Sequence, residues 1–301
     1  MKREARYYKN EKGKIRCNLC PHNCLIDDGK RGACNVREAS IDIEGNLKLY
    51  TLNYGEITSM AIDPVEKKPL HEFYPNSNIL SVGSFGCNFK CSFCQNYSIS
   101  QYEADSRFVD EEELAQLSLS LKDSIGLAFT YNEPSIWFEY VIDVAKRIKE
   151  QNKNHKVVLV TNGYINEEPL RELLQYVDAL NIDLKGNAEY YKKLCFGSLE
   201  DVKRTITIAN DEKKHIEVTT LLVPNSNCDN KSIEEVGVFL SNLNKDIPLH
   251  VSRYFPRYKM TERATSLDEM KMAYNLLKNY LNKVYLGNLN SDELSYCLNK
   301  D

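Results

Sequence analysis

Residues 83–94 read Gly-Ser-Phe-Gly-Cys-Asn-Phe-Lys-Cys-Ser-Phe-Cys, and they directly follow a short apolar run at 79–82. This stretch spaces Cys87, Cys91 and Cys94 as C-x3-C-x2-C in a loop that leaves a predicted strand. Thiolates are the natural ligands of iron–sulfur clusters, and three ligands on a four-iron cluster leave one iron open for a substrate. A zinc site with a distant fourth ligand, or buried free cysteines, are the alternatives. Because zinc sites usually pair two C-x2-C knuckles, the spacing favours a 4Fe-4S cluster.

Beyond this loop, short apolar runs alternate with longer amphipathic stretches, which predicts repeated strand–helix units and an α/β fold with a parallel sheet. Three of the amphipathic stretches begin with a helix-capping pattern, Asp110-x-x-Glu, Ser232-x-x-Glu and Ser266-x-x-Glu. An open doubly wound sheet and a full or partial barrel both fit these units, and periodicity does not choose between them. The predicted strands are 79–82, 126–130, 157–160, 179–183, 216–223, 249–252 and 284–286.

The chain divides by composition into three parts. Residues 1–60 are rich in cysteine, charge and short turns, which predicts a small Cys-rich lobe that needs a metal to stabilise it. Residues 61–77 contain several prolines and read as a connector. Residues 78–301 carry the strand–helix units and are expected to form the main domain.

Composition excludes several classes of function. Among the 301 residues, 39 Lys and Arg stand against 43 Asp and Glu, for a formal net charge of −4. This balance leaves no electrostatic footprint for nucleic acid or an anionic membrane, so neither is expected as a partner. The N-terminus lacks the pattern of a signal peptide, and the apolar runs are too short to span a bilayer. We therefore expect a cytoplasmic protein whose clustered cysteines bind metal rather than form disulfides.

A second group of cysteines lies near the N-terminus. Cys17, Cys20, Cys24 and Cys34 are spaced C-x2-C-x3-C-x9-C, and four thiolates this close together predict a closed metal site. Zinc and a second 4Fe-4S cluster both suit such ligands. Zinc is favoured, because four ligands leave no position open and the lobe has little other core. His22 lies inside the same loop and is expected to be surplus.

Polar side chains follow the predicted strands, at the ends where the sites of parallel α/β proteins gather. Each has a plainer explanation, as a helix cap, a turn, a local ion pair or a structural histidine. Their joint placement around the cysteine loop favours a binding role. They are Asn132 and Glu133, Thr161 and Asn162, Asp183 and Lys185, and His250 in the sixth predicted strand.

The motif C-x3-C-x-aromatic-C, with Phe93 as the aromatic residue, resembles the signature of radical S-adenosylmethionine enzymes. The resemblance implies a partial (β/α)6 TIM-type barrel. It also implies that the open iron binds the amino and carboxylate groups of S-adenosylmethionine. One electron then cleaves the sulfonium to methionine and a 5′-deoxyadenosyl radical, which abstracts hydrogen from a substrate that the sequence does not identify.

The same resemblance implies S-adenosylmethionine contacts for several residues, and it names no catalytic residue. Glu133 occupies the place of the glutamate in the family's Gly-Gly-Glu-Pro element, although Tyr131 and Asn132 replace the glycines. Asp183-x-Lys185 resembles an element that glycyl-radical activating enzymes use near the methionine carboxylate. Those enzymes often carry an Asp where Val160 stands here. The implied contacts are Phe93, Asn132, Glu133, Thr161, Asn162, Asp183, Lys185 and His250.

The order of motifs over nearly all 301 residues resembles the radical enzyme of the AmmeMemoRadiSam system. That family is related to the pyruvate formate-lyase activating enzymes. Its members often end in a further cysteine pair, whereas only Cys297 precedes this terminus, so no C-terminal metal site is expected. The motifs that carry the resemblance are Arg31-Gly-Ala-Cys34, Asp63-Pro-Val-Glu-Lys-Lys-Pro-Leu70, Cys94-Gln-Asn96 and His250-x-Ser-Arg-Tyr-Phe-Pro256.

Three functional hypotheses follow from these features. The first is a radical enzyme that receives its electron from a ferredoxin or flavodoxin and works with AMMECR-type and Memo-type companion proteins. The second is an activase that places a glycyl radical on a partner protein. The third is a non-enzymatic Fe-S and zinc protein that carries electrons or acts as a scaffold.

Overall fold

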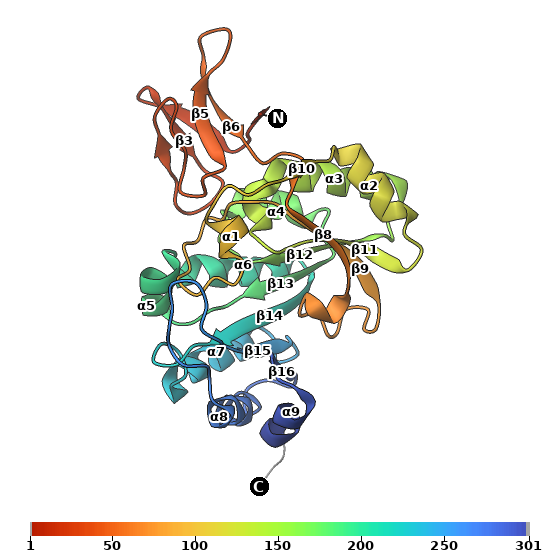
Figure 1. The fold of residues 1–301 in the computed structure, drawn as a ribbon, viewed down its shortest axis with the longest axis vertical. Coiled ribbons are helices and arrows are strands. Elements are labelled where there is room, and N and C mark those ends of the chain that lie inside the picture. The colour runs from red at the N-terminus through yellow and green to blue at the C-terminus, as the bar shows by residue number, and fades with distance from the viewer. Residues whose placement is uncertain (1, 299–301) are drawn as a thin grey trace.

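The computed structural model describes residues 2–298, and its centre is an eight-stranded sheet (Figure 1). The order is β16-β15-β14-β13-β12-β11-β9-β8, in which seven neighbouring strands run parallel and β8 pairs antiparallel with β9. All seven runs predicted as strands are confirmed. The strands are β8 (Ser59–Pro64), β9 (Asn78–Gly83), β11 (Ser124–Phe129), β12 (Lys156–Thr161), β13 (Ala179–Asp183), β14 (His215–Leu222), β15 (Leu249–Arg253) and β16 (Val284–Gly287).

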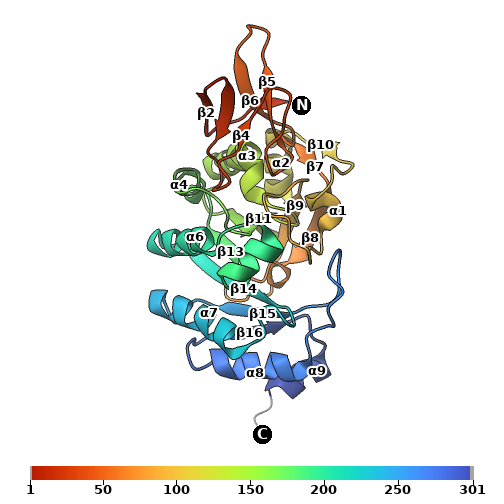
Figure 2. The same ribbon diagram turned by 90° about the vertical axis from the view of Figure 1, so that its left-hand side faces the viewer.

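The strand order decides between the two architectures that periodicity left open. In a doubly wound sheet the order reverses in the middle, but here each new strand from β9 to β16 is added on the same side. Six crossovers join the seven parallel strands and all wind in one direction, which makes a partial barrel with β8 and β16 as its edges. Figure 2 shows α6, α7 and α8 following one another along the molecule. The main helices are α2 (Glu111–Ser120), α3 (Phe138–Gln151), α4 (Glu167–Leu174), α6 (Leu199–Asp211), α7 (Asn230–Leu243), α8 (Leu267–Leu277) and α9 (Ser291–Leu298).

Two of the three predicted helix starts are confirmed. Asp110 caps α2 by accepting a hydrogen bond from the backbone N–H of Glu113, and Ser266 forms a complete capping box at α8. The start at Ser232 is wrong. Helix α7 begins at Asn230, because Asp229 caps it and accepts hydrogen bonds from the backbone N–H and the hydroxyl of Ser232.

The expected connector, residues 61–77, is part of the barrel, and this corrects the sequence prediction. Its first residues belong to β8, an edge strand, where a proline such as Pro64 is tolerated. Its remainder, which includes the short helix η1 (Val65–Lys67), packs on the inner face of the sheet. Val65, Leu70 and Phe73 form a buried cluster there with Ile79, Ala128, Val158 and Ala179. The segment therefore closes the inside of the barrel.

The N-terminal lobe lies at one end of the molecule and the C-terminal helices at the other (Figure 1). It holds two small antiparallel sheets. Short strands β7 (Glu56–Ile57) and β10 (Arg107–Phe108) pair across the boundary expected at residue 60. The first sheet is β1 (Arg3–Glu4), β6 (Leu47–Thr51) and β5 (Arg37–Ile41), and the second is β2 (Tyr8–Glu11), β3 (Lys14–Cys17) and β4 (Leu25–Ile26).

Helices of the described chain, residues 2–298, are all too short or too polar to cross a membrane.

Candidate functional site

The loop after β9 carries Cys87, Cys91 and Cys94 at the carboxyl end of the strand. Their thiols are largely buried, and burial raises the pKa of Cys87 and of Cys94 above the usual range. The pKa of Cys87 rises further because of the charge of Glu133 and the neighbouring Cys91. The three thiols therefore lie close enough to influence one another, as the ligands of one cofactor must.

Cys87 already accepts hydrogen bonds at its sulfur. The backbone N–H of Phe89 lies 3.3 Å from Cys87 Sγ, and Asn162 Nδ2 lies 3.7 Å from the same atom. Asn162 also donates to Asn88 Oδ1 at 2.8 Å. N–H donors of this kind tune the potential of iron–sulfur clusters. The donor set around Cys87 thus fits a thiolate that ligates such a cluster.

Cys91 lies against Cys195, a residue that sequence reasoning passed over as scattered. A hydrogen bond with the Cys195 side chain is the main cause of the raised pKa of Cys91, and burial adds to it. Two backbone hydrogen bonds hold the segments together, from Lys90 N to Cys195 O (2.9 Å) and from Ser92 N to Leu194 O (3.1 Å). Cys195 ends a short π-helix, η3 (Tyr191–Cys195), a feature frequent at functional sites. No spacing rule in the sequence could have found this contact.

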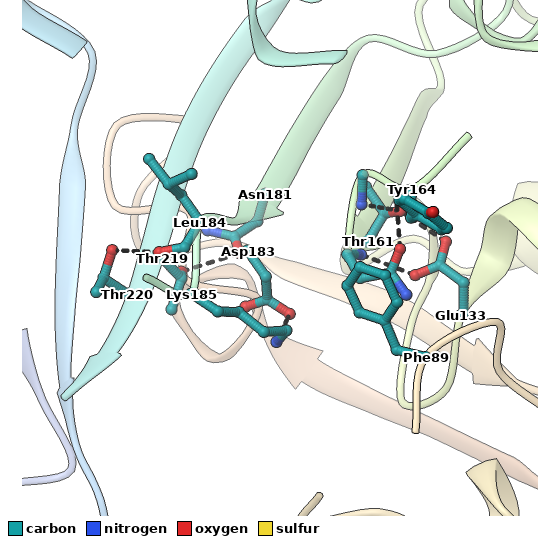
Figure 3. Close-up of polar contacts among 12 residues, drawn as sticks. Phe89, Glu133, Thr161, Tyr164, Asn181, Asp183, Leu184, Lys185, Thr219 and Thr220 are labelled. Atoms are coloured by element: carbon teal, nitrogen blue, oxygen red, sulfur yellow. Dashed lines mark hydrogen bonds and ion pairs between the residues drawn. The ribbon is translucent and has the colours of Figure 1, made fainter. Parts of the chain in front are cut away.

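Glu133 is buried, and its carboxylate holds the turn after β12. One oxygen accepts from Thr161 Oγ1 (2.6 Å) and from the backbone N–H of Ser135 (2.8 Å), and the other accepts from the backbone N–H of Asn162 (2.7 Å). Burial raises the pKa of Glu133, although these hydrogen bonds oppose the shift. Figure 3 shows the carboxylate pointing at Thr161. The structure therefore brings Glu133, Thr161 and Asn162 together.

Asn132 ties the cysteine loop to the same strand end. Its Oδ1 accepts from the backbone N–H of Ser84 (3.1 Å), and its Nδ2 donates to Gly86 O (3.1 Å). The preceding residue, Tyr131, has φ 71°, a conformation that favours glycine. The hydroxyl of Tyr131 donates to Asp63 at 2.9 Å. This anchor explains how a tyrosine can stand where a glycine would be expected.

Asp183 and Lys185 form a second polar group, at the end of β13 (Figure 3). Lys185 Nζ lies 2.7 Å from Asp183 Oδ2 and 5.8 Å from the ring centre of Phe93. Burial lowers the pKa of Lys185, but Asp183 and the nearby thiols of Cys91 and Cys195 outweigh it and raise that pKa well above its usual range. The cysteine loop therefore approaches Glu133 through Cys87 and the Asp183–Lys185 pair through Cys91.

His250 lies in a different set of contacts. Its Nε2 is 2.6 Å from an oxygen of the buried Glu217, and its ring stacks on Tyr285 and meets His71 edge-on. Glu217 also contacts His215 Nε2 at 2.9 Å. Burial raises the pKa of Glu217, but the two histidines lower it to about 2. In the sheet register His250 pairs with Thr219, which pairs with Asp183, so His250 stands two strands from the polar pair.

The four N-terminal cysteines are also brought together. They line one cavity, whose wall includes Arg37 and Ile136. Within residues 2–298 no three His, Cys, Asp or Glu side chains converge closely enough to hold an ion, and this applies to both cysteine groups. Loading a metal therefore requires the side chains to move closer together, and neutral thiols must also lose their protons first. His22, expected to be surplus, contacts Asn88 O in the other cysteine loop at 2.7 Å.

Comparisons with known proteins identify relatives of this chain. A model of the Radical SAM superfamily matches residues 81–235. An uncharacterized protein of Methanocaldococcus jannaschii is 40% identical, over 99% of this chain and 89% of that protein. A putative glycyl-radical enzyme activating enzyme of the same organism is 25% identical, over 72% of this chain and 92% of that protein.

Among solved structures, a radical SAM methyltransferase from Sphaerobacter thermophilus is similar with a TM-score of 0.55 and 12% identity. The likeness covers 97% of this chain and 78% of that one, and it concerns the fold alone. The superfamily match spans the cysteine loop and the strand ends that carry Glu133, Asn162, Asp183 and Lys185. The chain belongs to the Radical SAM superfamily.

Proposed function

We propose that the protein reductively cleaves S-adenosylmethionine and uses the resulting 5′-deoxyadenosyl radical to abstract hydrogen from a substrate. A 4Fe-4S cluster, when bound, supplies the electron for this cleavage. Cys87, Cys91 and Cys94 are proposed as its ligands. The observation that carries the proposal is the position of these thiols, between the Glu133 group and the Asp183–Lys185 pair at the carboxyl end of the sheet.

The neighbouring residues are proposed to bind the cosubstrate. Glu133 and Asn132 hold the loop and the Thr161–Asn162 turn in place, so they fix the shape of the site. The ammonium of Lys185 is proposed to meet the methionine carboxylate, with Asp183 orienting it at 2.7 Å. Phe93 would pack beside them. His250 is the least supported member of this set, because Glu217 already occupies its Nε2.

The decisive experiment is an anaerobic assay with reconstituted protein. We expect S-adenosylmethionine and dithionite to give 5′-deoxyadenosine, together with about four irons per chain at this site. Replacing Lys185 with Met should raise the KM for S-adenosylmethionine by about tenfold or more, since a charge-assisted hydrogen bond is worth roughly 1.5–3 kcal/mol. Reconstituted protein that retains its iron yet yields no 5′-deoxyadenosine would refute the proposal.

A second candidate function is activation of a partner protein by installing a glycyl radical on it. Two relatives support it: the putative activating enzyme described above, and another from the same organism that is 28% identical over 69% of this chain and 80% of that protein. Both names describe those proteins. An electron paramagnetic resonance signal on a protein that copurifies with this chain would favour this function over hydrogen abstraction from a small molecule.

The finer family assignment remains a proposal. We propose membership of the AmmeMemoRadiSam system, with AMMECR-type and Memo-type proteins as companions and a ferredoxin or flavodoxin as electron donor. The clustered thiols support the cytoplasm as the compartment. The assignment predicts that this chain copurifies with an AMMECR-type and a Memo-type protein. It also predicts that the complex is lost when any one of the three is absent.

The N-terminal lobe is proposed as a separate metal-binding unit. Cys17, Cys20, Cys24 and Cys34 are the proposed ligands, for zinc or for a second 4Fe-4S cluster. Support comes from the cavity that all four line. Iron and zinc counted per chain distinguish the two metals, since about four irons and one zinc indicate zinc in the lobe and about eight irons indicate two clusters.

A further inference from the structure

Arg37 is buried beside the four cysteines of the lobe. It is the first residue of β5, it is 1% exposed, and it lines the same cavity as Cys17 and Cys34. The cavity has a volume of about 10 Å³, which is space for one water-sized body. A charged side chain so deeply buried needs partners, because an unpaired buried charge is strongly destabilising.

Only part of the Arg37 guanidinium finds partners among the described residues. Nη1 donates to Arg6 O at 2.8 Å, and Nη2 donates to Glu139 Oε1 at 2.5 Å. Nε is buried and has no hydrogen-bond partner, and neither has Glu139 Oε2. The Nε–H is therefore an unused donor on a residue that lines the cysteine cavity. Leaving a buried donor unpaired costs about 1–3 kcal/mol, which a suitable acceptor would offset.

The cysteine sulfurs that line the same cavity are the candidate acceptors for this N–H. Burial lowers the pKa of Arg37, but Glu139 and the thiols of Cys17 and Cys34 outweigh it and raise the pKa. The guanidinium therefore lies within electrostatic reach of two of the four sulfurs. Four thiolates around a divalent zinc ion keep a net negative charge, and such sites are stabilised by N–H donors from surrounding residues.

We propose that Arg37 is the positioning residue of a zinc site formed by Cys17, Cys20, Cys24 and Cys34, to which it donates its Nε–H. Its ion pair with Glu139 then fastens the metal-loaded lobe to helix α3. The inference rests on the lobe metal site proposed above and commits it to zinc. Zinc is the metal that four thiolates complete without leaving a coordination position open.

The position of Glu139 gives this ion pair a wider effect. Glu139 lies in the first turn of α3, close in sequence to Ile136 of the cavity wall and to Glu133. The carbonyl of Cys34 and the side chain of Val36 also abut Gly86 of the other cysteine loop. Zinc in the lobe would therefore hold two segments of the S-adenosylmethionine site in position.

The test measures zinc retention in the full-length chain, purified without oxygen and challenged with a colorimetric zinc chelator. The variant replaces both Arg37 and Glu139 with Met, so that no unpaired charge stays buried. The matched control replaces Arg6 and Glu172 with Met. That pair also joins the lobe to the barrel, at 2.5 Å, but it is partly exposed and lies outside the cavity.

We expect the Arg37/Glu139 variant to lose zinc affinity by roughly tenfold to a hundredfold, the usual effect of removing a partner of a metal ligand. The control should keep the affinity of the unchanged chain. Arg37→Lys keeps the charge but loses the planar guanidinium and its several N–H donors, so its zinc affinity should lie between those of the two double variants. Hydrogen exchange at the start of α3 should increase on zinc removal in the unchanged chain, and less so in the Arg37/Glu139 variant.

The outcomes separate this inference from the proposals beneath it. Equal zinc retention in both double variants would overturn the role of Arg37 and leave the zinc site standing. About four extra irons in place of zinc would overturn the choice of metal. A lobe that binds neither metal would overturn the metal site itself, and the activity proposed for Cys87, Cys91 and Cys94 would be unaffected.

Discussion

The two cysteine groups differ in what surrounds their sulfurs. Those of the lobe face a small cavity walled by apolar side chains such as Ile26 and Ile136, with Arg37 as the charged neighbour. Those of the barrel loop face polar groups that can hold a further molecule, namely the Asp183–Lys185 pair and Asn162. The first arrangement suits the closed metal site proposed for the lobe, and the second places polar groups beside the thiols proposed to ligate the cluster. Spacing alone suggested this contrast, but the neighbours give it a physical basis.

The two groups are nevertheless in contact. Gly86, the residue before Cys87, lies against Val36 and the carbonyl of Cys34. His22 reaches the carbonyl of Asn88 from the lobe side. The two cysteine groups thus contact each other, so we expect a change at this contact to affect metal binding at both.

The largest expected effect separates the groups by function. Cys91→Ala should abolish 5′-deoxyadenosine formation and remove about four irons per chain, while zinc in the lobe stays bound. Iron and zinc by mass spectrometry, with the deoxyadenosine assay, check this. Cys228→Ala, a half-buried cysteine outside both groups, is the control and should change neither metal. Loss of zinc in the Cys91 variant would contradict the separation.

The second prediction concerns pH. Burial raises the pKa of Cys20, Cys24, Cys34, Cys87 and Cys94, so these thiols are neutral near pH 7 and release protons when metal binds. Metal affinity should therefore rise with pH and fall as pH drops. Each proton released makes the apparent metal affinity change by a further factor of about ten per pH unit. Zinc titrations around neutrality should show a steeper slope for the four-thiol lobe than iron loading of the three-thiol loop, and equal slopes would contradict it.

The third prediction targets the contact between the groups. In Gly86→Ala the new Cβ would lie 2.5 Å from Val36 Cγ1 and 2.9 Å from Cys34 O, at a φ of +87°. Overpacking and strain together should cost about 2–4 kcal/mol of unfolding free energy, and both metals should be held less tightly. Gly29→Ala is the control, because it has φ +68° and no neighbour within 4 Å. Chemical denaturation measures the loss of unfolding free energy in each variant. Equal losses would show that backbone strain, and not the contact with the lobe, lowers the stability.

The smallest expected effect is electronic. Asn162→Ala removes the N–H that lies 3.7 Å from Cys87 Sγ. This hydrogen bond, worth about 0.5–1 kcal/mol, favours the reduced and more negative cluster. Its loss should therefore lower the reduction potential by roughly 20–40 mV for one electron. A redox titration followed by electron paramagnetic resonance measures it, and the control is Asn282→Ala, whose amide donates to Asp246 and contacts no described cysteine. An unchanged potential would mean that Asn162 serves only the turn.

Much of the fold could be predicted because its signals are local. Apolar runs dominated by Val, Ile and Leu mark each parallel strand, and capping residues mark α2 and α8. The predicted start of α7 was wrong because Asp229, which lies three residues before Ser232, caps the helix instead. Residues 61–77 read as a connector because prolines stop regular structure, and the sequence does not show that an edge strand accepts them.

The site was predictable only where its residues follow strands. Glu133, Thr161 and Asn162 meet because parallel strands end at one edge, and Asp183 and Lys185 meet because they are two residues apart. Arg37, Cys195 and Glu217 escaped notice because their partners lie far away in the sequence. Their contacts depend on how the barrel and the lobe pack, which no local pattern records. The cofactor contacts themselves remain predictions.

The segment that closes the inside of the barrel limits how the protein can be divided. Val65, Leu70 and Phe73 cover the inner face, and the backbone N–H groups of His71 and Glu72 hold the carboxylate of Glu217. A chain shortened to begin at residue 78 would expose this apolar surface and leave a buried carboxylate without two of its donors. The barrel is therefore not a module that can be cut free or exchanged at its apparent boundary.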